Sequence, residues 1–546
     1  MYEPKETYRG YNANGIAEQQ SRRSSSYSNE NVLTYIKKIG QHSLNVMVGS
    51  SLLYEENKTG SMTARDFISD VYGYNNLDAG AQWDKPNTGR SKSTLLSGFG
   101  RINYVLMDKY LFTVTGRADG SSKFGANNKW AFFPSFAAAW RINQEKFMKN
   151  IDWISNLKIR GSWGVTGNQN IPAYSSPEKM NTYTYPIGGV TSVGIGAGNM
   201  PNPDLKWETT AITDIGIDLG VFNNRINFTA DYYYKKTTDL LWNISVPLTT
   251  GFGTVLKNIG SLQNKGLELS LSADVLTGPF KWNTMLNWST NKNKVLEIPG
   301  YIPTQQGTIS GHLKVNGSWL EPGLPVGVWN LLKTNGVMRT EKEWQDAARV
   351  ADSNFDKIGD MSFVDKNGDG KISFGEDRQI VGDPNPDFIF GWTNNFSYKN
   401  FDLSVYINGS VGNDIYNVLR AETNIVSAWG NQRAEVKDRW TVNNPNGKYP
   451  RAHVLVNQNL LQSDYLIEDG SFLRIQNVTL GYTFPKVSFL RSLRIYATAQ
   501  NLLTITGYSG YNPEVNSQGQ SNLQLGVDYN AYPTARSFIL GVNIGF

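Results

Sequence analysis

The residues best suited to chemistry lie in one twelve-residue segment, DKNGDGKISFGE, at positions 365–376. The segment matches the calcium-loop pattern D-x-[DN]-x-[DN]-G-x5-E at every specified position. Carboxylate and amide oxygens at positions 1, 3 and 5 suit a hard cation, glycine at position 6 permits the sharp turn, and glutamate at position 12 closes the site with two oxygens. The spacing therefore predicts a Ca²⁺ ion held by Asp365, Asn367, Asp369, the backbone carbonyl of Lys371, Ser373 and Glu376.

The same segment has a second interpretation, an Asx-rich turn that holds no metal. A paired EF-hand would also need flanking helices. Residues 341–351 favour one short helix, but Pro384 and Pro386 soon interrupt the chain on the other side. We therefore expect a lone structural ion that stiffens an extracellular loop at residues 353–387, not a calcium sensor.

Other kinds of reaction chemistry find little support. The chain has no cysteine, which excludes disulfides and thiolate chemistry, and its three histidines, His42, His312 and His453, form no spaced pair. No motif places a histidine beside a nucleophile and a carboxylate, so we expect no enzyme activity. The net charge of +5 comes from scattered residues, whereas nucleic-acid binding clusters its charge; no nucleic-acid partner is expected.

Aromatic side chains are frequent in the segments that read as long loops. Aromatic rings near hydrogen-bonding groups can stack on sugar rings or peptide side chains. The alternative is that these rings pack the loops or belong to an interfacial girdle. The candidate ligand contacts are Tyr183, Tyr185, Trp319, Trp329 and Trp429.

These loops are positioned by segments in which apolar and polar residues alternate. At residues 267–275, leucine, alanine and valine alternate with glutamate, serine and aspartate, and the last ten residues, SFILGVNIGF, end the chain on Phe546 in the same pattern. A period of two predicts strands, and a second face this polar fits a wet lumen. No run approaches the roughly 18 apolar residues of a membrane helix. The pattern predicts an all-β fold, a transmembrane antiparallel β-barrel surrounded by outer-membrane lipid.

The connections between these segments alternate between short and long. Short turns include residues 40–42, 107–109, 223–224, 277–279 and 399–400; the long connections are 55–93, 167–208, 238–264, 292–387, 412–470 and 503–535. Outer-membrane barrels place short turns in the periplasm and long loops outside. We count roughly 15 strands, beginning near Asn31. Because the last strand must run towards the periplasm, the alternation predicts that an odd number of strands is missing before this chain. The alternative is that one strand within a long loop has been miscounted.

Several motifs, in order along essentially the whole chain, resemble the SusC/RagA family of TonB-dependent outer-membrane transporters. They are YLFTVTGRADGSSKFG (110–125), WAFFPSFAAAW (130–140), LKIRGSWGVTGN (157–168), NPDLKWE (202–208), NIGS (258–261), NKGLE (264–268), FLRIQNVTLGY (472–482) and AQNLL (499–503). The resemblance implies a complete barrel of about 22 strands with an N-terminal plug. Residues 1–546 therefore read as the C-terminal part of such a barrel, without the plug.

The resemblance also implies a function. Family members import glycans or oligopeptides together with a SusD-like surface lipoprotein that closes over the barrel, and TonB supplies the force through the plug region, which is missing here. The alternatives are a passive porin-like channel, a surface-adhesion barrel, or a truncated transporter without function. The presence or absence of a plug distinguishes these functions. Fifteen strands without a plug would not form a stable closed barrel on their own, because both edge strands would be left unpaired.

Overall fold

The computed structural model describes residues 1–298, 318–425, 431–485, 489–515, 517, 519 and 523–546, and the backbone of residues 304–306. The chain forms two compact units. Unit 1 comprises residues 1–138, 162–212 and 237–259, and unit 2 comprises residues 139–161, 213–236 and 260–546. Each unit is described by itself below.

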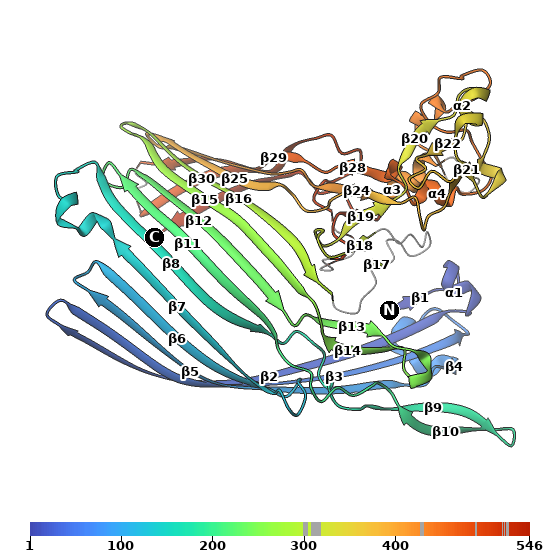
Figure 1. The fold of residues 1–546 in the computed structure, drawn as a ribbon, viewed down its shortest axis with the longest axis horizontal. Coiled ribbons are helices and arrows are strands. Elements are labelled where there is room, and N and C mark those ends of the chain that lie inside the picture. Colours follow the sequence, from blue (N-terminus) through green and yellow to red (C-terminus); the bar gives the residue numbers. More distant parts are fainter. Residues whose placement is uncertain are drawn as a thin grey trace. The chain divides into compact units, whose positions relative to one another are not determined.

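The described residues contain one sheet of 17 strands, in which β1 (Tyr2–Glu3) and β4 (Gly80–Trp83) are short (Figure 1). The pairings from β2 to β6 and from β15 to β32 are antiparallel, as the alternation predicted. The longer strands are β2 (Ile16–Ile39), β3 (His42–Phe67), β5 (Asn87–Leu106), β6 (Tyr110–Ser121), β7 (Trp130–Arg141), β8 (Ile154–Asn168), β11 (Glu208–Val221), β12 (Ile226–Thr238), β15 (Ser261–Thr277), β16 (Phe280–Glu297), β25 (Phe388–Tyr398), β26 (Phe401–Val411), β29 (Phe472–Phe484), β30 (Ser492–Thr506) and β32 (Ser537–Gly545).

In unit 1, the sheet starts earlier than the sequence predicted. Strand β2 begins at Ile16, well before Asn31, and pairs with β3 without a break from Ile16–Arg65 to Ile39–His42. The predicted loop at residues 55–93 is therefore largely strand, since β3 continues to Phe67 and β5 begins at Asn87. The reason is that residues 19–30 are exposed on both faces and almost entirely polar, so periodicity fails there although the backbone ladder continues.

Unit 2 shows how the alternation becomes two different faces. Residues directly opposite each other in an antiparallel pair point to the same side of the sheet. Glu268 of β15 lies opposite Ser289 of β16, whereas Leu269 lies opposite Trp288. One face is therefore polar and the other apolar, and on β32 the apolar residues Phe538, Leu540 and Val542 are exposed. This confirms the predicted alternation and fits a wall with water on one side and lipid on the other.

Several side chains on the wall of unit 2 reach across a whole strand, and a glycine makes room for each. Arg494 of β30 pairs with Asp402 of β26 above Gly481 of β29, where a Cβ atom would lie 2.4 Å from Arg494 Nη2 and 2.6 Å from Asp402 Oδ1. The same arrangement joins Arg160 to Asp231 above Gly216, and the Tyr233 hydroxyl to Asn291 above Gly266. These contacts tie together strands that share no ladder hydrogen bonds.

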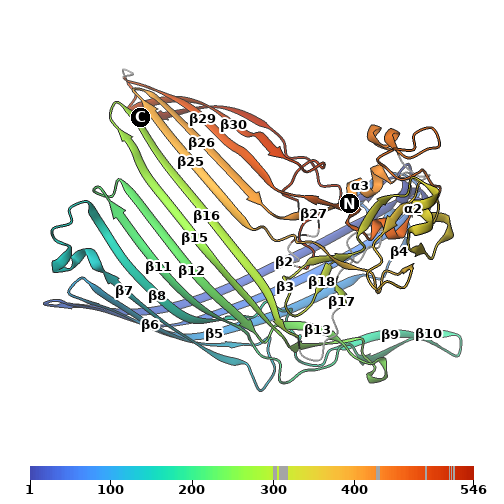
Figure 2. The same ribbon diagram turned by 45° about the horizontal axis from the view of Figure 1, so that its top comes forward.

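The largest dry core lies in the long connections of unit 2, not in the wall. Its buried members include Trp329, Leu331, Tyr416, Leu461 and Leu466. The connections form short strands around this core: β18 (Ser318–Leu320), β19 (Val328–Leu331), β20 (Thr334–Val337), β21 (Arg349–Val350), β22 (Met361–Phe363), β23 (Lys371–Ile372), β24 (Gln379–Gly382), β27 (Asp414–Asn417), β28 (Ile467–Asp469) and β31 (Val527–Asp528); β17 (Thr304–Gln306) pairs with β18. We call residues 318–387 and 412–470 the loop region (Figure 2).

Helices are short. They are α1 (Tyr8–Asn12), α2 (Glu341–Asp346), α3 (Val418–Asn424) and α4 (Gln458–Leu461). The helix predicted in residues 341–351 is present as α2, and Thr340 begins it with a capping box that it forms with Glu343. Among the described residues, no helix has the length and apolar character needed to cross a membrane.

Unit 1 carries two further hairpins in its long connections. Among the described residues, β9 (Met180–Ile187) and β10 (Val190–Ala197) pair only with each other, as do β13 (Leu241–Ser245) and β14 (Thr254–Asn258). The connections 167–208 and 238–264, which the sequence marked as long loops, thus contain regular structure of their own.

Candidate functional site

The predicted calcium loop forms the turn that its glycines permit. Gly368 and Gly370 have φ angles of 77° and 78°, in the left-handed region where glycine is favoured. The carboxylate of Asp365 accepts the backbone N–H groups of Gly368 at 2.6 Å and of Gly370 at 2.8 Å. The first residue of the motif therefore shapes the loop through hydrogen bonds.

The later ligand candidates partly converge. Oε2 of Glu376 lies 3.3 Å from Asn367 Nδ2 and 3.4 Å from Ser373 Oγ, while Asp369 Oδ1 accepts the N–H of Lys371 at 2.8 Å. Positions 3, 9 and 12 thus meet. Within the part of the chain that the structure describes, however, no group of three or more histidine, cysteine, aspartate or glutamate side chains gathers closely enough to hold a metal ion.

A residue that the sequence analysis did not select holds this loop in place. Asp377, directly after the twelve-residue motif, is 0% exposed, and its carboxylate accepts the N–H groups of Lys366 at 3.0 Å and Ser373 at 2.7 Å. These bonds join the beginning of the loop to its end. An acidic residue at this place carries no signal in the motif itself, which explains why sequence reasoning missed it.

The structure corrects two of the five candidate ligand contacts. Trp319 is 6% exposed and lies under the guanidinium of Arg378, whose carbon is 4.3 Å from the ring centroid. Trp329 is 0% exposed and packs against Tyr416 with ring centroids 5.6 Å apart. Neither ring offers a surface to a ligand, because both fill the loop region. Burial also lowers the pKa of Arg378.

The two tyrosine candidates have a different setting. Tyr183 and Tyr185 lie on β9, 49% and 46% exposed, on the face of the hairpin where β10 has glycines. A Cβ atom on Gly194 would lie 2.5 Å from the Tyr185 ring, so each ring covers the opposite backbone. Both remain accessible to a ligand or partner. The fifth candidate, Trp429, and also His312 lie outside the described residues.

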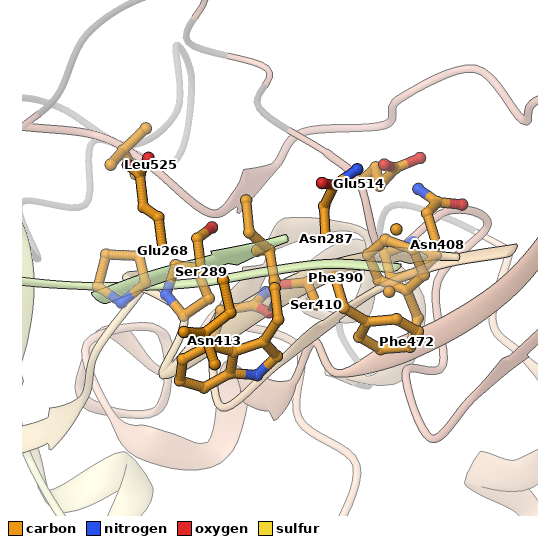
Figure 3. A pocket seen from close by; sticks show the side chains of 18 of the residues that line it. Glu268, Asn287, Ser289, Phe390, Asn408, Ser410, Asn413, Phe472, Glu514 and Leu525 are labelled. Carbon is orange, nitrogen blue, oxygen red and sulfur yellow. Dashed lines mark hydrogen bonds between the residues drawn. The ribbon is translucent and has the colours of Figure 1, made fainter. Parts of the chain in front are cut away.

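The polar face of unit 2 carries a hollow of about 820 Å³ that no motif indicated (Figure 3). Strands β12, β15, β16, β25, β26 and β29 contribute to it, together with loop residues such as Pro384 and Glu514. The polar side chains that line it include Asp231, Glu268, Asn287, Ser289, Tyr406 and Asn408. The alternation placed these residues on the wet face, but nothing in their spacing distinguishes them from other residues of that face.

A sheet with one polar and one apolar face, strands joined by short turns at one end and long structured connections at the other, defines the class of membrane-spanning antiparallel β-barrels. A family model described as "TonB dependent receptor-like, beta-barrel" matches residues 2–371, two thirds of the chain. The chain belongs to this family, as a SusC/RagA-like member, and hence to the bacterial outer membrane.

Similar proteins agree with this assignment. The chain is 36% identical to TonB-dependent receptor P3 of Formosa agariphila over 100% of its own length and 55% of the relative's. It is 33% identical to TonB-dependent receptor SusC of Bacteroides thetaiotaomicron, over 94% of this chain and 49% of SusC. Superposition of this chain on the solved structure of the RagAB peptide transporter gives a TM-score of 0.83 at 24% sequence identity. The match covers 97% of this chain and 56% of that one. The chain thus spans about half the length of the relatives it matches, and those relatives are receptors and transporters rather than enzymes.

Proposed function

We propose that this chain forms wall and outer loops of an importer that moves glycans or oligopeptides across the outer membrane. The observation that carries the proposal is a family-typical wall in unit 2 that has one polar, hollowed face, because a polar solute needs a wet surface to pass along. SusC and RagAB, by their names, are a TonB-dependent receptor and a peptide transporter, and both classes of solute are polar.

The proposed importer works with two partners. A SusD-like surface lipoprotein covers the outer loops, and TonB acts through a plug region of the complete transporter. The exposed hairpin β9–β10 supports the first contact, since an uncharged hairpin from Asn181 to Ala197 with exposed Ile187, Val193 and Ile195 suits a protein surface. A porin-like channel and an adhesin are the rivals.

Uptake by whole cells distinguishes these functions. Cells that carry the complete transporter are given fluorescent oligosaccharides and oligopeptides, with and without a functional TonB. Import predicts uptake that stops when TonB is deleted. Uptake that continues without TonB would establish a passive channel, and surface binding with no uptake in either strain would establish an adhesin or a non-functional transporter.

We also propose that residues 365–376 bind a structural Ca²⁺ ion. The left-handed Gly370, the convergence of Asn367, Ser373 and Glu376, and the anchoring carboxylate of Asp377 support this proposal. Asp365 and Asp369 would supply the charge and Lys371 its carbonyl. Among the described residues, the strand pairing of this loop is limited to Lys371 and Ile372 of β23 beside Arg349 and Val350 of β21, and the ion would add a further constraint.

Calcium titration of the folded transporter tests this proposal. Saturation at about 100 times Kd should stabilise the loop region by about 2.7 kcal/mol, and Asp365→Ala with Asp369→Ala should abolish the effect. The matched control, Glu341→Ala with Asp346→Ala, removes two acidic groups from the exposed helix α2 and should leave the calcium effect intact. A parent protein whose melting curve ignores calcium would contradict a structural ion.

A further inference from the structure

The hollow on the polar face of unit 2 has a defined set of walls. The strand register places Glu268 opposite Ser289 in one row, and Asn287, Gly391 and Asn408 opposite one another in the next row on the same face. The two rows lie side by side across β15, β16, β25 and β26. Loop residues close the other side of the hollow, among them Glu514, which Figure 3 shows with Glu268, Asn287 and Asn408. A solute in the hollow would therefore meet several polar groups at once.

Two residues that line the hollow carry a buried acceptor atom. Oδ1 of Asn408 and Oδ1 of Asp231 are buried, and neither has a hydrogen-bond partner among the described residues. A buried acceptor without a partner raises the free energy of the folded protein, and a ligand that donates a hydrogen bond removes that cost. The hollow thus favours a ligand rich in hydroxyl or N–H donors.

The charges in the hollow are unequally compensated. Asp231 pairs with Arg160 at 2.5 Å, and Glu514 pairs with Arg474. Arg474 is buried and also donates to Thr504 and Asn512, so its guanidinium is already engaged. Glu268 forms no ion pair among the described residues. An anionic ligand would face this carboxylate without a free cation beside it.

The floor of the hollow adds apolar surface between these polar groups. The Tyr406 ring lies over Gly391, where a Cβ atom would be 3.2 Å from its hydroxyl, and Phe472 is buried beside Ser410 in the register. Pyranose rings present hydroxyls at their edge and C–H groups on their faces. Acceptors next to an aromatic floor match both features.

We propose that this hollow is a binding site for an uncharged oligosaccharide, in which Asn408 and Glu268 accept hydrogen bonds from hydroxyls of different sugar units and Glu268 discriminates against anionic glycans. The inference rests on the proposed import function and narrows its substrates. A basic peptide is the competing ligand, because an ammonium group also donates to acceptors. The geometry favours the sugar, since only one of the three carboxylates is uncompensated, and the hollow also contains the neutral acceptor of Asn408 and the aromatic surface of Tyr406 and Phe472.

Binding measurements on the complete transporter, purified with its lipoprotein partner from the outer membrane, test the binding site. The probes are maltohexaose, cellohexaose, hexagalacturonate and a lysine-rich hexapeptide. The parent should prefer at least one neutral hexasaccharide to hexagalacturonate. Asn408→Ala should weaken the affinity for the neutral hexasaccharide roughly tenfold. Glu268→Gln should lower the ratio of the affinity for the neutral hexasaccharide to that for hexagalacturonate roughly tenfold. Asn283→Ala, on the same face of β16 but outside the hollow, should change neither value.

Three results would overturn the binding site: a parent that prefers hexagalacturonate, a parent that binds only the hexapeptide, or Asn408→Ala and Glu268→Gln variants that bind every probe as the parent does. Uptake measurements in cells that carry the parent or the variants distinguish failure of the proposed binding site from failure of the proposed import function. TonB-dependent import with unchanged selectivity in both variants overturns the binding site alone. Loss of TonB dependence in the parent overturns import, while the binding data still report on the hollow.

Discussion

Two long connections share a sequence signature of aromatic residues among glycines and polar residues, yet they fold in opposite ways. The loop region of unit 2 closes around Trp329, Leu331 and Leu461, which have no exposed surface. The β9–β10 hairpin of unit 1 has no interior, and its tyrosines are about half exposed. One connection behaves as a small domain and the other as an open arm.

The difference follows from how many separate segments contribute apolar side chains. The core of the loop region draws on residues between 329 and 372, between 416 and 466, and on Val527, so that segments distant in the sequence cover one another. The hairpin has only its own two strands, and two strands cannot cover both of their faces. Aromatic content alone therefore does not predict burial.

The largest difference between the two connections is expected when one aromatic ring is removed from each. Trp329→Ala should destabilise the loop region by about 3–5 kcal/mol, because it leaves a large cavity in a closed core. Tyr185→Ala should change stability by no more than about 0.5 kcal/mol, as expected for an exposed site. Amide hydrogen exchange of the two segments measures both effects. Equal losses would show that the hairpin is packed as firmly as the loop region.

The second test concerns a buried ion pair that the hairpin lacks. Asp360 is buried and accepts a hydrogen bond from Arg451 Nε at 2.8 Å. Burial raises the pKa of Asp360 above its ordinary value, although Arg451 acts in the opposite direction. Arg451→Ala leaves a buried carboxylate unpaired and should cost about 3–5 kcal/mol near neutral pH.

The pH dependence of this variant distinguishes lost charge from lost packing. The folded-state pKa of Asp360 lies above its unfolded value. The stabilisation that protonated Asp360 contributes is therefore complete below the unfolded-state pKa and is lost as the pH rises through the folded-state pKa. Arg451→Ala removes the partner that lowers this pKa, so acidification should restore much of the loss. Adding Asp360→Asn should abolish the pH dependence. A deficit that is constant with pH would assign the loss to packing.

The comparison also bears on what the sequence could predict. Strand alternation and the order of short and long connections were readable because each depends on a local period. The start of β2 at Ile16 was not, since residues 19–30 are almost entirely polar and have no apolar face, so that only the ladder with β3 defines the strand there. The calcium loop is predictable from spacing, but its anchor Asp377 is not, because burial depends on the surrounding fold.

The same limit explains the aromatic candidates and the hollow. Trp329 and Tyr185 look alike in sequence, and only contacts between distant segments make one a core residue and the other an exposed one. Glu268 and Asn408 lie 140 positions apart and come into neighbouring rows on one face through the register of four strands. A pattern within one strand assigns a residue to a face but does not identify its neighbours across the sheet.

A matched pair of glycines gives a third, smaller test. Gly359 in the loop region has a φ angle of 92°, and a Cβ atom there would lie 2.4 Å from Trp440 Cε3. Gly359→Ala should cost about 1–3 kcal/mol from the clash, and strain in the left-handed backbone adds to it. Gly194→Ala brings a Cβ atom to 2.5 Å from Tyr185 Cε1, but that exposed ring can turn away. Its cost, measured by hydrogen exchange, should stay within about 0.5 kcal/mol.

The smallest expected effect tests the hairpin itself. The Tyr183 hydroxyl donates a hydrogen bond to the backbone carbonyl of Ala197 at 3.0 Å. Tyr183→Phe removes this bond and keeps the ring, so an exposed site should lose about 0.5 kcal/mol or less, measured as faster amide exchange across β9 and β10. Tyr183→Ala also uncovers Gly196 and should exchange faster still. If Tyr183→Phe instead costs as much as Gly359→Ala, a partner encloses the hairpin in the assembled transporter. The contrast between the two connections would then be a property of this chain alone, because the partner would supply the core that two strands cannot build.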